Sequence, residues 1–336
     1  MPYPLIVDVK RHSHDDGPGI RSVVFFKGCP LSCIHCHNPE TQEPKVDIAF
    51  SPRNCIRCGR CAEICPEGAI DLSRPERIQR EACSRCGLCA AVCPGNGLQQ
   101  IGRYLPPERL LEILHRDLPF YRHSRGGVTL SGGECTGYPD YLQTLLRDLK
   151  RSGIHVALQT CGEFDYSAFH HKILPYVDLI FFDLKFADAQ THRKHTGRSN
   201  GRILENLERL LLDRPDVVHP RIPMVPGITA TEENLAGLAA ILDEVGASEV
   251  TLLPYNPLGL DMYERLGRPV PSIPRQFMKP QEEENVRNRF QTLVAKRLRA
   301  RSGPEAKPLG ERTPIPPGRG KTGQEGANGF AGGQKP

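Results

Sequence analysis

Three cysteines near the start of the chain, Cys29, Cys33 and Cys36, are spaced as C-x3-C-x2-C. They supply three thiolates, whereas a four-iron cluster ordinarily takes four cysteine ligands. The fourth iron would then have no protein ligand, and an open coordination position is where a metal site can do chemistry. We therefore predict a reactive iron–sulfur cluster at these three cysteines.

Eight more cysteines follow in two runs, each spaced C-x2-C-x2-C-x3-C and each followed by a proline. This is the spacing of bacterial ferredoxins with two clusters, where the fourth cysteine of each run ligates the cluster of the other run. Two closed clusters beside an open one predict an electron relay to a reactive centre. The expected ligand sets are Cys55, Cys58, Cys61 and Cys93 for one cluster, and Cys83, Cys86, Cys89 and Cys65 for the other.

The remaining cysteines, Cys135 and Cys161, are predicted to be small core fillers without a role. Because the other 11 of the 13 cysteines belong to cluster motifs, no disulfide framework is expected. Residues 1–10 lack a basic stretch followed by an apolar core, and no segment reaches the ~18 apolar residues of a membrane span. Reduced thiols and no export signal predict a cytoplasmic protein without membrane partners. Of the net charge of +5, +3 lies in residues 301–336, so no nucleic-acid partner is expected.

Strand and helix patterns alternate on both sides of the cysteine runs, which predicts a parallel α/β sheet. One helix is expected over 138–151, with Pro139 in its first turn, and another over 231–244, with Thr231 as its N-cap. Six strand–helix units make a partial (βα)6 TIM-like barrel. The predicted strands are Val23–Lys27, Val128–Ser131, Val156–Gln159, Leu179–Asp183, His219–Val225 and Val250–Leu253.

These patterns divide the chain into four parts. Residues 1–46 begin the barrel and carry the first cluster loop, and residues 47–103 form an inserted ferredoxin-like domain for two [4Fe–4S] clusters. Residues 104–300 complete the barrel. Residues 301–336 are rich in glycine and proline and poor in apolar side chains, which predicts a disordered tail.

The loops after the predicted strands contain the unusual residues, as expected where parallel strands end. The cysteine triplet follows the first strand. Gly132 and Gly133, after the second strand, permit close backbone approach to a ligand, and Glu134 offers a carboxylate to an ammonium group. Asp183 and Lys185, two residues apart at a strand end, point the same way and can hold a polar ligand together.

On these residues the chain resembles the glycyl-radical-enzyme activating enzymes of the radical S-adenosylmethionine (SAM) superfamily. The resemblance covers roughly residues 5 to 295. Pyruvate formate-lyase activase is similar in the barrel blocks but lacks the insert. The blocks that carry the resemblance are Gly17-Pro18-Gly19-Ile20-Arg21, Gly28-Cys29 through Cys36 and Asn38, Ser131-Gly132-Gly133-Glu134, Asp183-Leu184-Lys185, Thr196-Gly197, Val225-Pro226-Gly227 and Leu252-Leu253-Pro254-Tyr255.

The resemblance implies an oxidoreductase that cleaves SAM reductively to a 5′-deoxyadenosyl radical, which removes a hydrogen from a glycine of a partner glycyl radical enzyme. It further implies three [4Fe–4S] clusters and SAM as cofactors, and flavodoxin or ferredoxin as electron donor; we expect a monomer. The chemistry is the cofactor's, and the protein orients it and excludes water. The implied SAM-binding residues are His35, Cys36, His37, Gly132, Gly133, Glu134, Asp183, Leu184, Lys185 and Asn256.

Two positions depart from the family pattern. The residue before the third cysteine is often aromatic in relatives, and here it is His35, a smaller ring that can carry charge. Asn256 stands where pyruvate formate-lyase activase has a histidine; an amide hydrogen-bonds but does not titrate. SAM binding is expected to survive both changes.

Several alternatives remain open. The cysteines can form structural zinc sites instead of clusters, and Asp183 with Lys185 can be a structural ion pair. The chain can also be an iron–sulfur electron carrier with a vestigial barrel, or a radical SAM enzyme acting on a small molecule or a peptide.

Overall fold

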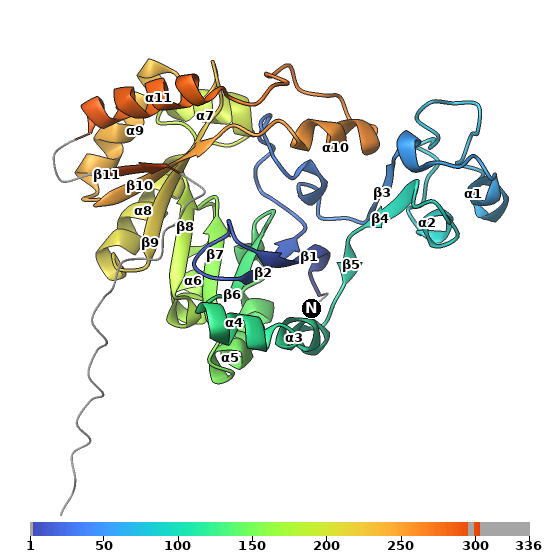
Figure 1. The fold of residues 1–336 in the computed structure, drawn as a ribbon, viewed down its shortest axis with the longest axis horizontal. Coiled ribbons are helices and arrows are strands. Elements are labelled where there is room, and N and C mark those ends of the chain that lie inside the picture. Colours follow the sequence, from blue (N-terminus) through green and yellow to red (C-terminus); the bar gives the residue numbers. More distant parts are fainter. Residues whose placement is uncertain (1–2, 295–298, 303–336) are drawn as a thin grey trace, which may run out of the picture.

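The computed structural model describes residues 3–294 and 299–302, and its main feature is a nine-stranded sheet with the order β11-β10-β9-β8-β7-β6-β2-β1-β5 (Figure 1). Strands β2 and β6 to β11 run parallel, while β1 pairs antiparallel with both β2 and β5. The strands are β1 Leu5–Ser13, β2 Arg21–Phe26, β5 Arg103–Tyr104, β6 Gly127–Gly132, β7 His155–Thr160, β8 Leu179–Asp183, β9 Val218–Met224, β10 Glu249–Pro254 and β11 Arg299–Ser302.

All six predicted strands are confirmed, as β2 and β6 to β10, and they lie side by side in chain order. The structure adds β1, β5 and β11. Strand β1 was missed because it alternates apolar and charged residues and lies in an antiparallel hairpin with β2, outside the repeating strand–helix pattern. Among the described residues no pairing joins β11 to β5, so the α/β sheet is open, as a partial barrel requires.

Amphipathic helices cover the sheet and form the main core. Helix α5 (Pro139–Arg151) buries Leu142, Leu145, Leu146 and Leu149, the i, i+3, i+4, i+7 stripe of a helix packed on one face. Its predicted start at Pro139 is confirmed, as is the Thr231 cap of α9, whose hydroxyl accepts a hydrogen bond from the Asn234 amide. The other helices of this layer are α3 Pro107–His115, α4 Leu118–Ser124, α6 Tyr166–Lys172, α7 Ala189–Thr196, α8 Gly201–Asp213, α9 Glu232–Glu244 and α11 Pro280–Leu293. Helix α10 (Gly259–Arg265) lies apart from them, next to residues 47–50.

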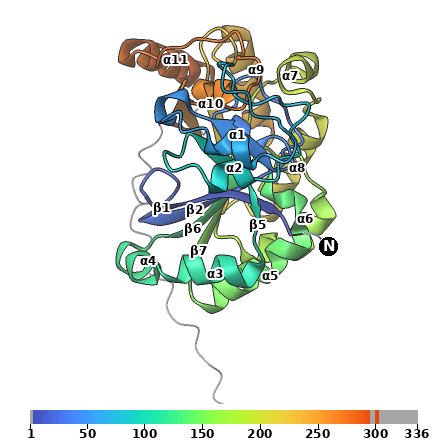
Figure 2. The same ribbon diagram turned by 90° about the vertical axis from the view of Figure 1, so that its right-hand side faces the viewer.

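Residues 47–103, here called the cysteine-rich segment, project from one side of the sheet (Figures 1 and 2). Strands β3 (Asp47–Phe50) and β4 (Leu98–Ile101) form a separate antiparallel pair, and the short helices α1 (Arg60–Ile64) and α2 (Leu88–Ala91) lie beyond it. The segment has its own small apolar cluster, made by Ile48, Phe50, Ile70, Ile78, Leu98 and Cys89. The chain therefore leaves the main sheet after β2 and returns to it at β5.

Polar contacts fix the cysteine-rich segment to the rest of the molecule. The buried carboxylate of Asp47 pairs with Arg80 of the segment (3.3 Å) and with Arg268, just after α10 (2.9 Å). Arg80 also donates to the carbonyl of Arg265 (3.1 Å), and the Arg265 guanidinium donates to Gln99 of the segment (2.6 Å). The segment is thus held against α10 and does not depend on its two chain connections alone.

The predicted tail and the predicted lack of a membrane span can be compared only with the residues that the structure describes. The predicted tail, residues 301–336, lies outside the described residues except for 301 and 302, which belong to β11. Within the described part, no helix is both long and apolar enough to cross a membrane.

Candidate functional site

A cavity of about 540 Å³ opens at the carboxyl edge of the parallel strands, where the sequence predicted a site. This volume lies within the range of small-molecule pockets. The cavity is bounded by the loops that follow β2, β6, β7, β8 and β10. Ten of the predicted site residues line it: Cys29, Cys33, His35, Cys36, His37, Gly132, Gly133, Asp183, Lys185 and Asn256.

The loop with the first three cysteines is held in shape by backbone hydrogen bonds. The amide of Gly28 donates to the carbonyl of Thr41 (2.7 Å), which closes the base of the loop. Ser32 and Ile34 donate to the carbonyls of Thr196 and His195 at the end of α7 (2.8 and 3.0 Å). The Thr196-Gly197 block therefore supports the cysteine loop from outside.

The two glycines after β6 lie against the end of β2. A Cβ at Gly132 would meet the Phe26 carbonyl at 2.4 Å, and one at Gly133 would meet the Gly28 carbonyl at 2.3 Å. The amide of Gly133 donates to Phe26 (2.8 Å), and that of Glu134 donates to Gly28 (2.8 Å). The backbone at these glycines was predicted to approach a ligand closely. In the structure it lies close to the end of β2, the strand that leads into the cysteine loop.

Glu134 and Leu184 were predicted in the pocket but do not line it. The Glu134 carboxylate is buried and accepts hydrogen bonds from the Thr136 and Thr160 hydroxyls and the Cys161 amide (2.7–3.0 Å). Burial raises its pKa, and these donors oppose that rise. Glu134 thus joins two loops and offers no free carboxylate to a ligand. Leu184 points into the core because side chains alternate along an extended segment.

Asp183 is the centre of a charged cluster inside the cavity. It accepts hydrogen bonds from Arg221 on β9 (2.8 and 2.9 Å) and lies 3.7 Å from the Lys185 ammonium. Burial works to lower the pKa of Lys185, but Asp183 and the nearby cysteine thiols raise it above its ordinary value. The ion-pair alternative is therefore present, yet the two cations facing one carboxylate leave positive charge for an anionic ligand.

Arg221 was not predicted, although a signal existed. It is an arginine in the middle of β9, with its guanidinium 4.6 Å from the ring centre of Phe181. Asp16 and Gln159 also line the cavity and are hydrogen-bonded to each other (3.0 Å). Asp16 directly precedes the Gly17–Arg21 block, whose position before β2 gave no indication that the chain returns to the cavity.

His35 is neutral in this environment. Burial, followed by the positive charge of Lys185, lowers the pKa of the imidazole to about 3. Both ring nitrogens are buried, and neither has a hydrogen-bond partner among the described residues. Orphaned polar atoms that face a cavity are expected to be satisfied by a ligand, and a SAM molecule would fit that need.

Cys161 takes part in the site, so its prediction as a plain core filler was incomplete. The residue lines the cavity, and a hydrogen bond between its thiol and Cys29 lowers the pKa of Cys29. Burial instead raises the pKa of Cys33 to about 11. A buried thiol of this kind ionises when a metal replaces its proton, which fits an iron–sulfur cluster. Cys135 is wholly buried in the main core, as predicted.

The other eight cysteines line two small cavities in the cysteine-rich segment. One cavity is bounded by Cys55, Cys58, Cys61 and Cys93, and the second by Cys65, Cys83, Cys86 and Cys89. This crossed grouping is what the spacing led us to expect of two clusters. A tetrahedral zinc with Zn–S of about 2.3 Å needs its sulfurs tightly gathered. Among the described residues, no group of three His, Cys, Asp or Glu side chains is placed to hold a single metal ion.

The comparisons with known proteins agree with this geometry. The radical SAM superfamily profile matches residues 23–239. The isethionate sulfite-lyase activating enzyme of Nitratidesulfovibrio vulgaris is 39% identical over 276 residues, 80% of this chain and 89% of that protein. The trans-4-hydroxy-L-proline dehydratase activating enzyme of Clostridioides difficile is 36% identical over 294 residues, 86% of this chain and 96% of that protein.

A solved radical SAM methyltransferase from Sphaerobacter thermophilus superposes with a TM-score of 0.51 at 12% identity, covering 88% of this chain and 77% of that one, which supports the fold alone. The matches to the two relatives cover most of both chains. The family match includes the cysteine triplet. The chain therefore belongs to the radical SAM superfamily and, within it, to the activating enzymes of glycyl radical enzymes.

Proposed function

We propose that the cavity binds SAM beside a [4Fe–4S] cluster held by Cys29, Cys33 and Cys36. The observation that carries this proposal is the meeting of three thiols, an orphaned imidazole and a charged cluster around one cavity of about 540 Å³. When bound, the cluster and SAM would supply a 5′-deoxyadenosyl radical. The chain's own residues hold and orient the molecule that delivers it.

Two parts of SAM have a suitable partner on the cavity wall. Its carboxylate would be held by the positive charge of Lys185 and Arg221, which exceeds that of Asp183. Its polar adenine edge would satisfy the orphaned nitrogens of His35, whose neutral ring can donate from one nitrogen and accept at the other. The backbone at Gly132 and Gly133 and the side chains of His37 and Asn256 line the remaining wall.

We further propose that the cysteine-rich segment is a ferredoxin-like domain holding two more [4Fe–4S] clusters. The support is the crossed grouping of the eight cysteines around two cavities. With the barrel site, the protein would contain three clusters. Electrons from a flavodoxin or ferredoxin would enter through the segment, and a monomer in the cytoplasm would suffice for the reaction.

For the protein partner, we propose a glycyl radical enzyme. The two relatives described above are named for a sulfite-lyase and a dehydratase. The glycine loop of the partner would approach the cavity at the carboxyl edge of the sheet, where the cavity opens.

The test combines the reconstituted protein anaerobically with SAM, a reductant and candidate glycyl radical enzymes encoded in the same genome. We expect a glycyl doublet by electron paramagnetic resonance (EPR) and release of 5′-deoxyadenosine. A partner with its radical glycine changed to alanine should give no doublet. Release of 5′-deoxyadenosine with a small metabolite or a short peptide, and no doublet with any candidate, would favour the small-substrate alternative.

A further inference from the structure

The two cavities of the cysteine-rich segment are built on the same backbone plan. Arg57 and Arg85, each the residue before the second cysteine of its run, have φ of 58° and 59°. Gly59 and Gly87, each the residue after that cysteine, have φ of 81° and 83°. Positive φ at matched positions gives both cysteine loops the same turn. Differences between the two cavities therefore arise from the side chains around them.

Backbone donors to sulfur are also matched. The amide of Ala69 donates to Cys65 Sγ (3.3 Å) in one cavity, and the amide of Leu98 donates to Cys93 Sγ (3.4 Å) in the other. Hydrogen bonds to cluster sulfurs raise the reduction potential of iron–sulfur clusters. Because each cavity receives one such backbone bond, these donors do not distinguish the two.

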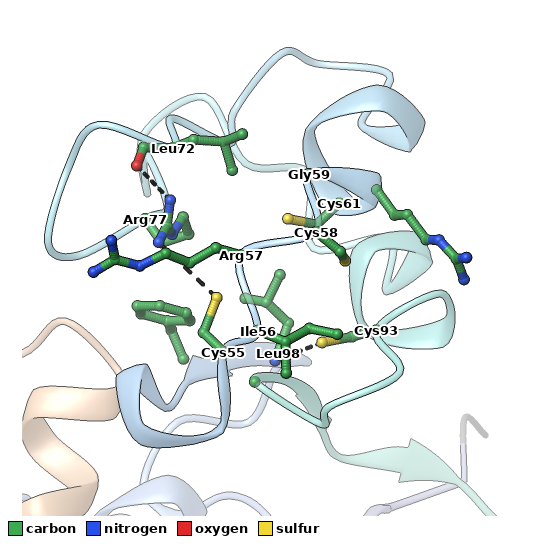
Figure 3. Close-up of a pocket in the computed structure, with 13 residues that line it drawn as sticks. Cys55, Ile56, Arg57, Cys58, Gly59, Cys61, Leu72, Arg77, Cys93 and Leu98 are labelled. Atoms are coloured by element: carbon green, nitrogen blue, oxygen red, sulfur yellow. Dashed lines mark hydrogen bonds between the residues drawn. The ribbon is translucent and has the colours of Figure 1, made fainter.

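A buried arginine does distinguish them. Arg77 lies beside the Cys55 cavity with 8% of its surface exposed, and its Nη2 donates a hydrogen bond to Cys55 Sγ (3.9 Å; Figure 3). Its Nε is buried and has no partner among the described residues, which leaves one donor for a group in the cavity. The wall of the Cys83 cavity includes Glu67 and, among its described residues, no arginine or lysine. Arg80 lies near Cys83, but its charge is paired with Asp47.

Three contacts fix the position of the Arg77 side chain. Its Nη1 donates to the carbonyl of Leu72 across the loop that precedes it. Its guanidinium lies 5.5 Å from the ring centre of Phe50, a cation–π contact. Its backbone has φ of 62°, a conformation that costs a non-glycine residue energy and that tends to be retained at functional sites. Arg77 is thus preorganised to face Cys55.

The Cys55 cavity is also the one farther from the barrel. Along β3, which starts at the junction with Asp47, Ile48 lines the Cys83 cavity and Phe50 lines the Cys55 cavity. Helix α1, which carries Cys61, lies at the far tip of the molecule, and α2, which carries Cys89, lies closer to the sheet (Figure 1).

We propose that Arg77 raises the reduction potential of the cluster at Cys55, Cys58, Cys61 and Cys93 above that of its neighbour, so that this outer cluster accepts the electron from the donor protein. The inference rests on the proposed presence of two clusters in the segment. The physical reason is that reduction adds one negative charge, and a buried cation that hydrogen-bonds a ligand sulfur stabilises the reduced form. One electron from a ferredoxin or flavodoxin enters, and no bond is made or broken.

The test is an EPR-monitored redox titration of the full-length reconstituted protein with Arg77→Met, which keeps the apolar stem but removes charge and donors. At a fixed potential, we expect the ratio of reduced to oxidised form of one cluster to fall about tenfold. This corresponds to a midpoint potential lowered by about 59 mV for a one-electron couple. The other cluster should be unchanged. The matched control is Arg74→Met, which removes the same charge from an exposed position on the same loop.

Two ligand variants assign the midpoint potentials to the clusters. Cys58→Ser should alter the midpoint potential that Arg77→Met lowers, and Cys86→Ser should alter the midpoint potential of the neighbouring cluster. Equal shifts with Arg77→Met and Arg74→Met, or a shift confined to the midpoint altered by Cys86→Ser, would overturn the proposal. If the Arg77→Met variant does not assemble its cluster, the alternative test uses wild-type protein labelled with guanidino-¹⁵N arginine. In its EPR spectrum we expect ¹⁵N coupling on the cluster that is reduced first. Absence of this coupling would contradict the role of Arg77.

Iron content separates this inference from the function on which it rests. About twelve irons per chain with no effect of Arg77 would overturn the inference alone. About four irons, all lost when Cys29, Cys33 and Cys36 are replaced, would instead overturn the proposed pair of clusters in the segment.

Discussion

The barrel site and the cysteine-rich segment use the same ligand chemistry in opposite surroundings. At the barrel site three cysteines share a cavity of about 540 Å³ with charged and polar side chains. In the segment, four cysteines line each cavity, and the rest of the wall combines apolar residues such as Ile48 or Phe50 with a few polar and charged side chains. A cluster at the first site would be able to bind another molecule, whereas clusters at the other two would be closed.

The side chains that face the cysteines therefore decide the function of each site more than the number of cysteines does. Asp183, Lys185 and Arg221 place three charges beside the three-cysteine loop, where a zwitterionic ligand can be held. In the segment, the buried Arg77 lies beside one of the cavities, where it would tune the proposed cluster. With the proposed clusters in place, reactivity and electron transfer would be separated between two parts of one chain.

The largest expected effect comes from removing the barrel cysteines. Alanine at Cys29, Cys33 and Cys36 together should remove about four of about twelve irons and abolish SAM cleavage, because the open iron is lost. Iron analysis and 5′-deoxyadenosine assays check this. Full cleavage by the triple variant would contradict the assignment of the reactive site.

A partial loss is expected from the segment. Replacing Cys58 and Cys86 should slow turnover with a ferredoxin or flavodoxin, yet leave some SAM cleavage driven by dithionite, because a small reductant can reach the barrel site directly. Rates with the two reductants are compared in the same preparation. Complete loss with dithionite, with the barrel cluster intact by EPR, would mean that the segment also gates or shapes the reactive site.

A smaller effect is expected within the barrel site at Asp183. Asp183→Asn removes the carboxylate shared by Arg221 and Lys185, which should weaken SAM binding through misplaced cations and cost about 1–3 kcal/mol of stability. Anaerobic SAM-binding titrations and urea unfolding measure the two changes. Asp148→Asn, which breaks an exposed pair with Arg151, is the control and should stay within about 0.5 kcal/mol.

The smallest effect is expected away from both regions, at His155 on β7. Burial, followed by the charge of Arg21, lowers its pKa to about 4. In the unfolded chain this histidine binds a proton near pH 6.5, whereas in the folded chain it stays neutral until about pH 4. The free energy of unfolding should therefore fall as the pH decreases from 6.5 toward 4. At pH 5.5 this amounts to about 1 kcal/mol. Unfolding curves of wild type and His155→Gln should converge at low pH; parallel curves would contradict the shift.

The sequence predicted the six central strands and two helix ends because these depend on local pattern. Of the ten predicted residues that line the cavity, His35, His37 and Asn256 were expected only because of the family resemblance. Gly132 and Asp183 could be placed at the cavity since parallel strands end at the same edge of a sheet. Long-range contacts could not be predicted. Arg221 pairs with a residue 38 positions away, and Asp16 reaches Gln159 across 143 positions.

Two errors have the same origin. Glu134 was expected to face a ligand, but its loop turns it toward Thr160 and Cys161, which satisfy the carboxylate inside the protein. Cys161 was expected to be a filler because it is isolated in sequence, whereas the fold brings it to Cys29. In both cases a side chain's partner comes from the end of another strand, which spacing along one chain does not reveal.

The most direct test of the contrast between open and closed sites is to add SAM to the reduced, fully reconstituted protein and follow all clusters by EPR and by iron-57 Mössbauer spectroscopy. We predict that SAM changes the signal of one cluster and of one iron within it, and that the signals of the other two clusters stay unchanged. The change should vanish in the Cys29, Cys33 and Cys36 variant. A SAM-induced change in the clusters of the cysteine-rich segment, or none in any cluster, would contradict this prediction.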